Sequence, residues 1–337
     1  MPIPPDSYEL YVLDLIQRIL GLDAAAYQEF ALLFGPMLLD HMLRKGLPQP
    51  KAEELAADFL NSSLGKLNLY WPESGPLPEW ILAHADARYQ GWLRRLCGFE
   101  RDLEAAANTQ AALMPPIHPA IKGLEACFLH RPLRLVTGDF CDLLPADGDG
   151  TLIAMGDASG KGASAALYGI LAGSWLRAFS QPDLSPTELL DRLDAALKEF
   201  RVGSQYATLL LACWHPESSR FVLCNGGVPP PILFRNSDLS WVTVNGSPLG
   251  LPIPAEFEQI DLPVLPGDLL VLYSDGIPDQ LGPEGSTYGD ARFAEIIRQT
   301  GQDTSERIAR SLLADLERFR GGIEQHDDQM VLVMRVM

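Results

Sequence analysis

The sequence predicts an all-helical N-terminal domain followed by a C-terminal domain with an α+β layered-sandwich fold. In residues 6–100, leucine and alanine recur at helical spacing in segments that Gly and Pro separate. From about residue 115, short apolar runs of strand character dominate, and helical segments interrupt them in only two blocks. Strands in runs with helices gathered in pairs are typical of an α+β sandwich rather than of an alternating parallel sheet.

The junction between the domains is predicted to be a helix over residues 101–114, which the prolines of PPIHP end because proline cannot continue a helix. We therefore expect a helical domain over 1–100, a connector helix over 101–114 and a sandwich domain over 115–337. Further helices are expected over about 162–201, where Ser185 to Glu188 form a capping-box sequence, and over about 290–319. The strands are expected at residues 133–140, 151–157, 206–214, 220–225, 231–235, 240–244, 268–276 and 329–336.

Length and composition restrict the class of protein. A chain of 337 residues, 47% of them hydrophobic, can bury a large core. The net charge of −18 argues against a nucleic-acid surface, because such a surface needs clustered Lys and Arg. Neither a long apolar run nor a basic, apolar leader is present, so we expect no membrane contact and a cytoplasmic location. The five scattered cysteines are interpreted as core thiols in a reducing compartment.

Acidic residues stand at the ends of four predicted strands. Asp139 ends the run LRLVTGDF, Asp157 ends TLIAMGD, and Asp275 follows DLLVLYS. Asp327 and Asp328 come directly before QMVLVMRV. Aspartate next to glycine is also ordinary turn chemistry, which would explain any one of them alone. Four at corresponding places on apolar strands instead predict convergence at one rim of a sheet, in the oxygen-rich kind of site that Mg²⁺ and Mn²⁺ prefer.

Four motifs carry a family resemblance. VTGDFCDLL, MGDASGKGASAAL, YSDGIPD and HDDQMVLVMRV resemble, in order and spacing, the motifs of the SpoIIE/RsbU-type PP2C-like (PPM) serine/threonine phosphatases, and NTQAALMPP resembles the family's entry segment. The resemblance covers about residues 105–337. It implies an αββα sandwich with a metal centre at one edge that hydrolyses phosphoserine or phosphothreonine on a protein. The implied substrate is a STAS-type anti-sigma antagonist in a bacterial partner-switching pathway.

The resemblance also implies roles for individual residues. By position, Asp157 would bridge two Mn²⁺ or Mg²⁺ ions, and the backbone carbonyl of Ala158 would be a further ligand. Asp275 and Asp327 would complete the metal ligands, and Asp139 would act through metal-bound water or a further ion. Two such ions make a water more acidic and neutralise charge on a phosphoryl group attacked in line, so no covalent enzyme intermediate is needed.

Neighbouring residues match this site less well. An extended strand points Asp139 and Asp142 to opposite faces, so only Asp139 is expected at the site. Asp328 would orient a ligand rather than bind an ion itself. His326 is either a proton donor to the leaving group or a solvated loop residue. Val228, in CNGGVPPP, stands at a position where the family has a histidine, which affects substrate contacts more than catalysis.

The segment GDASGKG is not interpreted as a nucleotide-binding P-loop. It has one residue too few between its glycines, and no Ser or Thr follows the Gly-Lys pair. Its glycines instead allow the backbone to turn closely past the predicted carboxylate cluster into a helix. Lys161 within it is interpreted as a solvated lysine at a helix start.

The helical domain is open to two interpretations. KAEELAADFLNSSLGKL and WILAHADARYQGWLRRL give residues 8–96 a limited resemblance to the second region of extracytoplasmic-function sigma factors. Residues 1–100 carry 13 acidic and 8 basic side chains, however, which disfavours promoter binding. The alternative is an amphipathic bundle that forms a homodimer or receives a signal. The chain is thus predicted to be an active phosphatase or, alternatively, a regulatory binding protein with a phosphatase-like domain and a sigma-factor-like module.

Overall fold

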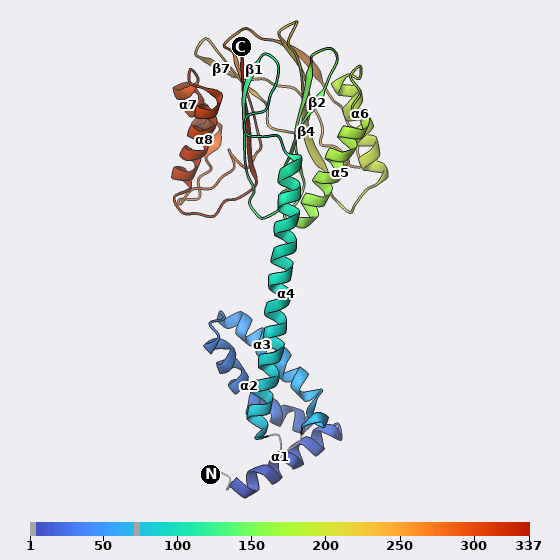
Figure 1. Ribbon diagram of the computed structural model, residues 1–337, viewed down its shortest axis with the longest axis vertical. Coiled ribbons are helices and arrows are strands. Elements are labelled where there is room, and N and C mark those ends of the chain that lie inside the picture. The colour runs from blue at the N-terminus through green and yellow to red at the C-terminus, as the bar shows by residue number, and fades with distance from the viewer. Residues whose placement is uncertain (1–4, 71–74) are drawn as a thin grey trace. The chain divides into compact units, whose positions relative to one another are not determined.

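The computed structural model describes residues 5–70 and 75–337 (Figure 1). The chain forms two compact units, Met1–Arg101 and Asp102–Met337. Within the described ranges, none of the helices combines the length and the apolar character that crossing a membrane requires.

The first unit is helical. Its core forms because α2 presents Phe30, Phe34 and Leu38 on one face at a spacing of four residues, and they are buried with Phe59 and Ile81 from two other helices. The elements are α1 (Pro5–Leu20), α2 (Ala24–Arg44), α3 (Gln49–Leu64), the 3₁₀ turn η1 (Leu67–Leu69) and α4 (Leu77–Leu113).

Helix α4 begins in the first unit and ends in the second. It runs unbroken from Leu77 to Leu113, so residues 101–113 are its C-terminal part rather than a separate helix. The only proline inside its bounds, Pro78, lies in the first turn, where a missing N–H costs nothing. The helix ends before Pro115 and Pro116, as the sequence predicts.

The second unit contains two antiparallel five-stranded sheets. One sheet has the strand order β1 (Leu124–Arg131), β10 (Gln329–Val336), β9 (Leu269–Tyr273), β6 (Ile232–Arg235), β7 (Asp238–Trp241). The other has the order β2 (Phe140–Pro145), β3 (Thr151–Ala158), β4 (Ala207–His215), β5 (Arg220–Gly226), β8 (Gln259–Pro263).

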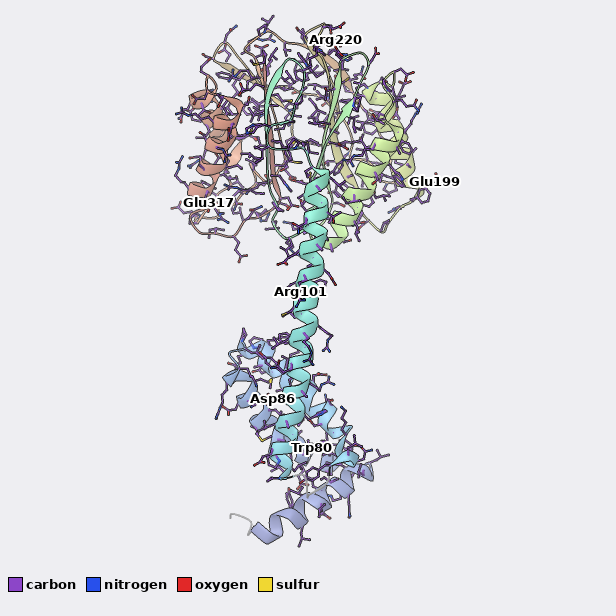
Figure 2. All side chains as sticks on the ribbon, viewed as in Figure 1. Trp80, Asp86, Arg101, Glu199, Arg220 and Glu317 are labelled. Atoms are coloured by element: carbon purple, nitrogen blue, oxygen red, sulfur yellow. The ribbon has the colours of Figure 1, made fainter. Side chains whose placement is uncertain are left out.

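Helices cover the outer face of each sheet (Figure 1). α5 (Ala163–Phe179) and α6 (Pro186–Glu199) pack on the β2–β8 sheet, and α7 (Gly289–Thr300) and α8 (Ser305–Arg320) pack on the β1–β7 sheet. Glu199 and Glu317 mark these opposite outer layers in Figure 2. A third apolar cluster fills the space between the sheets. The result is the αββα sandwich that the sequence resemblance implies, and the capping box at Ser185 and Glu188 is confirmed.

One predicted strand is wrong. Residues 133–139 are irregular, and β2 begins only at Phe140. The reason is that side chains, not a neighbouring strand, accept the backbone N–H groups of this segment: Asp328 accepts from Leu133 and Gly138, and Gln110 accepts from Thr137. The strands β1 and β8 were not predicted, and β7 ends at Trp241 rather than at residue 244.

Candidate metal centre

Strand alternation places polar side chains at one end of the space between the sheets. On β3, Met155 belongs to the apolar cluster between the sheets, and Asp157, two residues on, lies on the same face. On β4, Leu210 belongs to that cluster, and Thr208 precedes it by two residues and pairs with Asp157 in register. Asp328 lies directly before β10 and precedes the buried Met330 of that strand by two residues. Each inward row of apolar residues therefore ends in a polar one.

Asp139 lies just before β2 and is almost completely buried, with 2% of its surface exposed. Its Oδ2 atom has no hydrogen-bond partner among the described residues. Burial, followed by repulsion from Asp157, Asp328 and Asp275, raises the pKa of Asp139 well above its usual value. A buried carboxylate oxygen without a partner is costly, so this position suits a carboxylate that has a cation beside it.

Asp157 is the penultimate residue of β3 and lies beside the same cluster. Burial, together with repulsion from Asp275 and Asp327, raises its pKa from 3.8 to about 7. The pKa of Asp275 is raised as well, first by burial and then by repulsion from Asp327. The four carboxylates predicted as metal ligands are thus brought together closely enough to repel one another, which is the electrostatic setting that a dication relieves.

Glycines bring the acid-bearing segments together. A Cβ atom on Gly276 would lie 2.0 Å from the carbonyl oxygen of Asp328, so only glycine lets the loop after β9 contact the loop before β10. A Cβ on Gly138 would lie 2.7 Å from the carbonyl oxygen of Ala158 and 2.9 Å from Oδ1 of Asp157. The predicted carbonyl ligand of Ala158 is therefore beside the Asp157 carboxylate.

Three neighbouring residues contact the loops of the acidic rim, the name used below for the cluster of Asp139, Asp157, Asp275 and Asp327. Lys161 forms an ion pair with Asp327 at 2.9 Å and donates a hydrogen bond to the carbonyl of His326 at 2.6 Å, so it is not simply a solvated lysine. Asp328 accepts backbone hydrogen bonds from residues 133 and 138, which orients the segment leading to Asp139. His326 lies on the same loop, where its backbone N–H donates to Gln280.

Asp142 lies apart from this cluster. Its carboxylate accepts a hydrogen bond from the guanidinium of Arg177 on α5, and Arg177 also donates to the carbonyl of Leu113 at the end of α4, at 3.1 Å. Asp142 therefore faces the helical layer, on the opposite side of β2 from Cys141, which belongs to the core between the sheets.

The acidic rim offers carboxylate oxygens, which are the ligands that divalent cations such as Mg²⁺ prefer. Within residues 5–70 and 75–337, no three acidic, histidine or cysteine side chains are arranged so that they could hold an ion on their own. Mg²⁺ in particular is commonly bound by one or two carboxylates and keeps several waters. The unpartnered Oδ2 of Asp139 and the mutual repulsion of the carboxylates supply what such an ion needs, so the residues present fit it.

The raised pKa of Asp157 has a consequence for stability. A carboxyl whose pKa is higher in the folded than in the unfolded state contributes stability that is present below about pH 4 and is lost as the pH rises through about 7. We therefore expect the melting temperature of the metal-free protein to fall more between pH 5 and pH 8 than that of Asp157→Asn. Thermal unfolding with a chelator measures this difference, and equal falls in both proteins would contradict it.

A small pocket adjoins the acidic rim between the two sheets. Asp157 and Asp275 line it, together with Thr208 of β4 and Val228 of the loop after β5. Only Val228 and the two aspartates were singled out from the sequence. Thr208 belongs to no sequence motif. Its position at the pocket follows only from the pairing of β4 with β3, which places it opposite Asp157.

Comparison with known proteins identifies the family of the chain. A family model described as Stage II sporulation protein E (SpoIIE) matches residues 147–337, more than half of the chain. The chain belongs to the SpoIIE family. It is 22% identical over 236 residues to phosphoserine phosphatase RsbU of Bacillus subtilis, an alignment that covers 69% of this chain and 70% of RsbU.

Solved structures show the same fold for this SpoIIE-family chain. The SiaA-PP2C domain of Pseudomonas aeruginosa superposes with a TM-score of 0.65 at 21% identity, covering 72% of this chain and 98% of that one. The RsbU and RsbW domains of Rv1364c from Mycobacterium tuberculosis give a TM-score of 0.56 at 26% identity, covering 66% and 62% of the two chains. The second unit of this SpoIIE-family chain therefore has the fold of the PP2C domains that it superposes on.

Proposed function

We propose that this chain removes phosphate from phosphoserine or phosphothreonine on a folded protein, using two or more Mn²⁺ or Mg²⁺ ions held at the acidic rim. The observation that carries the proposal is the convergence of four carboxylates, in which burial and repulsion between the acids raise the pKa of Asp139, Asp157 and Asp275 and Asp327 is one of the repelling groups. Such a cluster is stable in its charged form only with compensating positive charge.

Each residue has a distinct part in this proposal. Asp157 and Asp275 would hold the ions directly, with the carbonyl of Ala158 as a further ligand and Asp139 on the buried side. Asp327 would contribute its half-buried carboxylate, which Lys161 orients through their ion pair. When bound, the ions supply positive charge to the phosphoryl group under attack and make a water molecule more acidic.

A covalent cysteine intermediate is not part of the proposal. Cys141 is the cysteine nearest to Asp139 in the sequence, and it is buried in the core between the sheets. Burial raises the pKa of its thiol, so it remains protonated and is a poor nucleophile. The proposal therefore assigns the attack on the phosphorus to water.

The proposed substrate is a phosphorylated STAS-type anti-sigma antagonist in a partner-switching pathway in the cytoplasm. The similarity to phosphoserine phosphatase RsbU and to the RsbU and RsbW domains of Rv1364c supports this choice. We further propose that residues 1–100 serve as a module for regulation, recruitment or dimerisation, joined to the phosphatase domain through residues 101–114.

The test is hydrolysis of a chromogenic phosphate ester and of a phosphoserine-containing STAS-type protein by the full chain. Activity should disappear with a chelator and return with Mn²⁺ or Mg²⁺. Because contacts remote from the phosphate help to position it, kcat/KM for the phosphoprotein should exceed that for free phosphoserine by at least about a hundredfold. Absence of hydrolysis of either substrate with both metals would instead favour the binding-scaffold alternative.

A further inference from the structure

A buried glutamine joins the two loops that carry Asp275 and Asp327. Gln280 lies in the segment between β9 and α7, and it is completely buried. Its Nε2 atom donates to the carbonyl of Glu324 at 3.2 Å, and its Oε1 atom accepts from the backbone N–H of His326 at 3.1 Å. Because Asp327 directly follows His326, the amide on one loop holds the backbone of the other beside a proposed metal ligand.

The hydrogen-bonding capacity of this amide is used in full. Nε2 also donates to the carbonyl of Leu281 at 2.9 Å, and Oε1 also accepts from the side chain of Gln329 at 3.1 Å. Two N–H groups and two lone pairs are all that a glutamine amide offers. A fully satisfied polar side chain in the interior is rigid, so Gln280 fixes the two loops relative to each other.

The turn after β9 connects Gln280 to Asp275. The N–H of Asp279 donates to the carbonyl of Asp275 at 3.0 Å, and the N–H of Ile277 donates to the carbonyl of Ser274 at 3.3 Å. The side chain of Ile277 is buried in the apolar cluster that α7 and α8 form with the β1–β7 sheet. Backbone hydrogen bonds and burial therefore hold Gln280 in place relative to Asp275.

The backbone of His326 is hydrogen-bonded on both sides of the loop. Its N–H donates to Gln280, and its carbonyl accepts from Lys161 at 2.6 Å. The Lys161 side chain is 38% exposed, whereas Gln280 is buried. Hydrogen bonds are stronger in the interior, and water and salt weaken the interactions of exposed charges. Of these two contacts, the one with Gln280 therefore contributes more to the position of Asp327.

The two loops need such a connection because their carboxylates repel each other. Burial and then repulsion from Asp327 raise the pKa of Asp275. In the absence of a dication, this repulsion favours separation of the loops. The neutral amide of Gln280 opposes the separation without adding a charge to the acidic rim.

We propose that Gln280 is a positioning residue that sets the distance between Asp275 and Asp327. With the loops connected in this way, the two carboxylates are already in place for Mn²⁺ or Mg²⁺, so less binding free energy is lost in ordering the loop of Asp327. This inference rests on the proposed phosphatase function, in which the two carboxylates hold ions. It adds to that function a residue that acts only through the proposed ligands.

Gln280→Met tests this role, because methionine has a similar length and forms none of the four hydrogen bonds. Calorimetry of Mn²⁺ binding to the metal-free full chain should give a dissociation constant raised by about tenfold to a hundredfold, the usual cost of losing a group that orients a metal ligand. Gln280→Asn keeps the amide but is one methylene shorter, and should raise the constant by a smaller factor. If thermal unfolding in chelator shows that Gln280→Met is not folded, Gln280→Asn decides the result.

Tyr288→Phe is the matched control. Tyr288 is buried in the same segment between β9 and α7, and its hydroxyl donates to Asp315 of α8 at 2.9 Å. The variant loses a buried hydrogen bond and some stability, as Gln280→Met does, but no contact with the loop of Asp327. It should keep the Mn²⁺ affinity of the wild type. Unchanged Mn²⁺ affinity in the folded Gln280 variants, or an equal loss in Tyr288→Phe, would overturn the inference.

Hydrolysis of the chromogenic ester 4-nitrophenyl phosphate separates this inference from the proposed function. If the wild-type chain binds neither Mn²⁺ nor Mg²⁺ and leaves the ester intact, the phosphatase proposal fails and the role of Gln280 fails with it. If the wild type binds Mn²⁺ and hydrolyses the ester, and the Gln280 variants bind Mn²⁺ equally well, the phosphatase proposal stands and only the role of Gln280 is lost.

Discussion

Replacing Asp157 by asparagine is expected to lower kcat by more than about a hundredfold. Loss of a group that merely supports a metal ligand typically costs 10- to 100-fold, so loss of a carboxylate that holds the ions should cost more. Asp139, Asp157 and Asp275 repel one another through the negative charges that would attract a dication. The neutral amide removes one of these charges. The same result is expected for Asp275→Asn. Calorimetry should show weaker Mn²⁺ binding in both variants.

A control variant distinguishes the loss of this particular carboxylate from the loss of any acidic side chain, and a stability measurement distinguishes it from unfolding. Asp261→Asn removes a carboxylate from the exposed edge strand β8, where its partner is Arg220, and should leave kcat unchanged. Asp157→Asn should be at least as stable as the wild type without metal at pH 8, because it relieves repulsion. Wild-type turnover in Asp157→Asn would remove this residue from the proposed centre, whereas an unfolded variant would contradict the electrostatic account.

The convergence of the acids was predictable because it depends on strand polarity and on alternation. Asp157 and Asp275 follow apolar runs that can only be central strands, and β3 and β9 are indeed interior strands of their sheets. The choice of Asp139 over Asp142 came from the resemblance with support from alternation; the structure places Asp142 against Arg177 in the helical layer, whereas Asp139 lies in the irregular segment before β2, where alternation does not apply. Local patterns carry this information because successive side chains along a strand point to opposite faces of the sheet.

Other features depend on contacts between segments far apart in the sequence, which no local pattern reveals. The run LRLVTGDF has strand-like composition, yet the Asp328 carboxylate takes its backbone N–H groups and keeps it irregular. Gly276 has the sequence context of a turn residue. The structure requires glycine there because a Cβ atom would lie only 2.0 Å from the carbonyl oxygen of Asp328. Lys161 likewise acquires its role only when the loop of Asp327 folds beside it.

Gln110, on the C-terminal part of α4, connects that helix to the segment bearing Asp139. It is 7% exposed, and its side chain donates to the carbonyl of Thr137 at 2.7 Å and accepts from the N–H of Thr137 at 3.0 Å. The hydroxyl of Thr137 in turn accepts a hydrogen bond from the N–H of Asp139 at 3.0 Å. Two hydrogen bonds from one side chain to the backbone of the buried Thr137 thus fix the position of a proposed catalytic carboxylate.

Gln110→Ala is expected to lower kcat by about tenfold to a hundredfold and to raise the Mn²⁺ concentration needed for half-maximal activity. The substitution leaves a buried N–H and C=O of Thr137 unpaired, and a displacement of about 1 Å at a reacting centre can cost about a hundredfold. Gln90→Ala, which changes an exposed glutamine of the same helix, is the matched control and should behave as the wild type. Unchanged Mn²⁺ dependence in Gln110→Ala would show that α4 does not position Asp139.

The same contact predicts how residues 1–100 would act on the phosphatase domain. A fragment that starts near Arg101 keeps Gln110, whereas one that starts near Pro115 lacks it, so only the second should reproduce the low activity of Gln110→Ala. A regulatory role for the helical unit requires the full chain to differ from the Arg101 fragment when a partner or signal shifts α4 between two arrangements. Rates and Mn²⁺ dependence that are equal in all three proteins, with and without partners, would reduce residues 1–100 to a recruitment or dimerisation module and α4 to a tether.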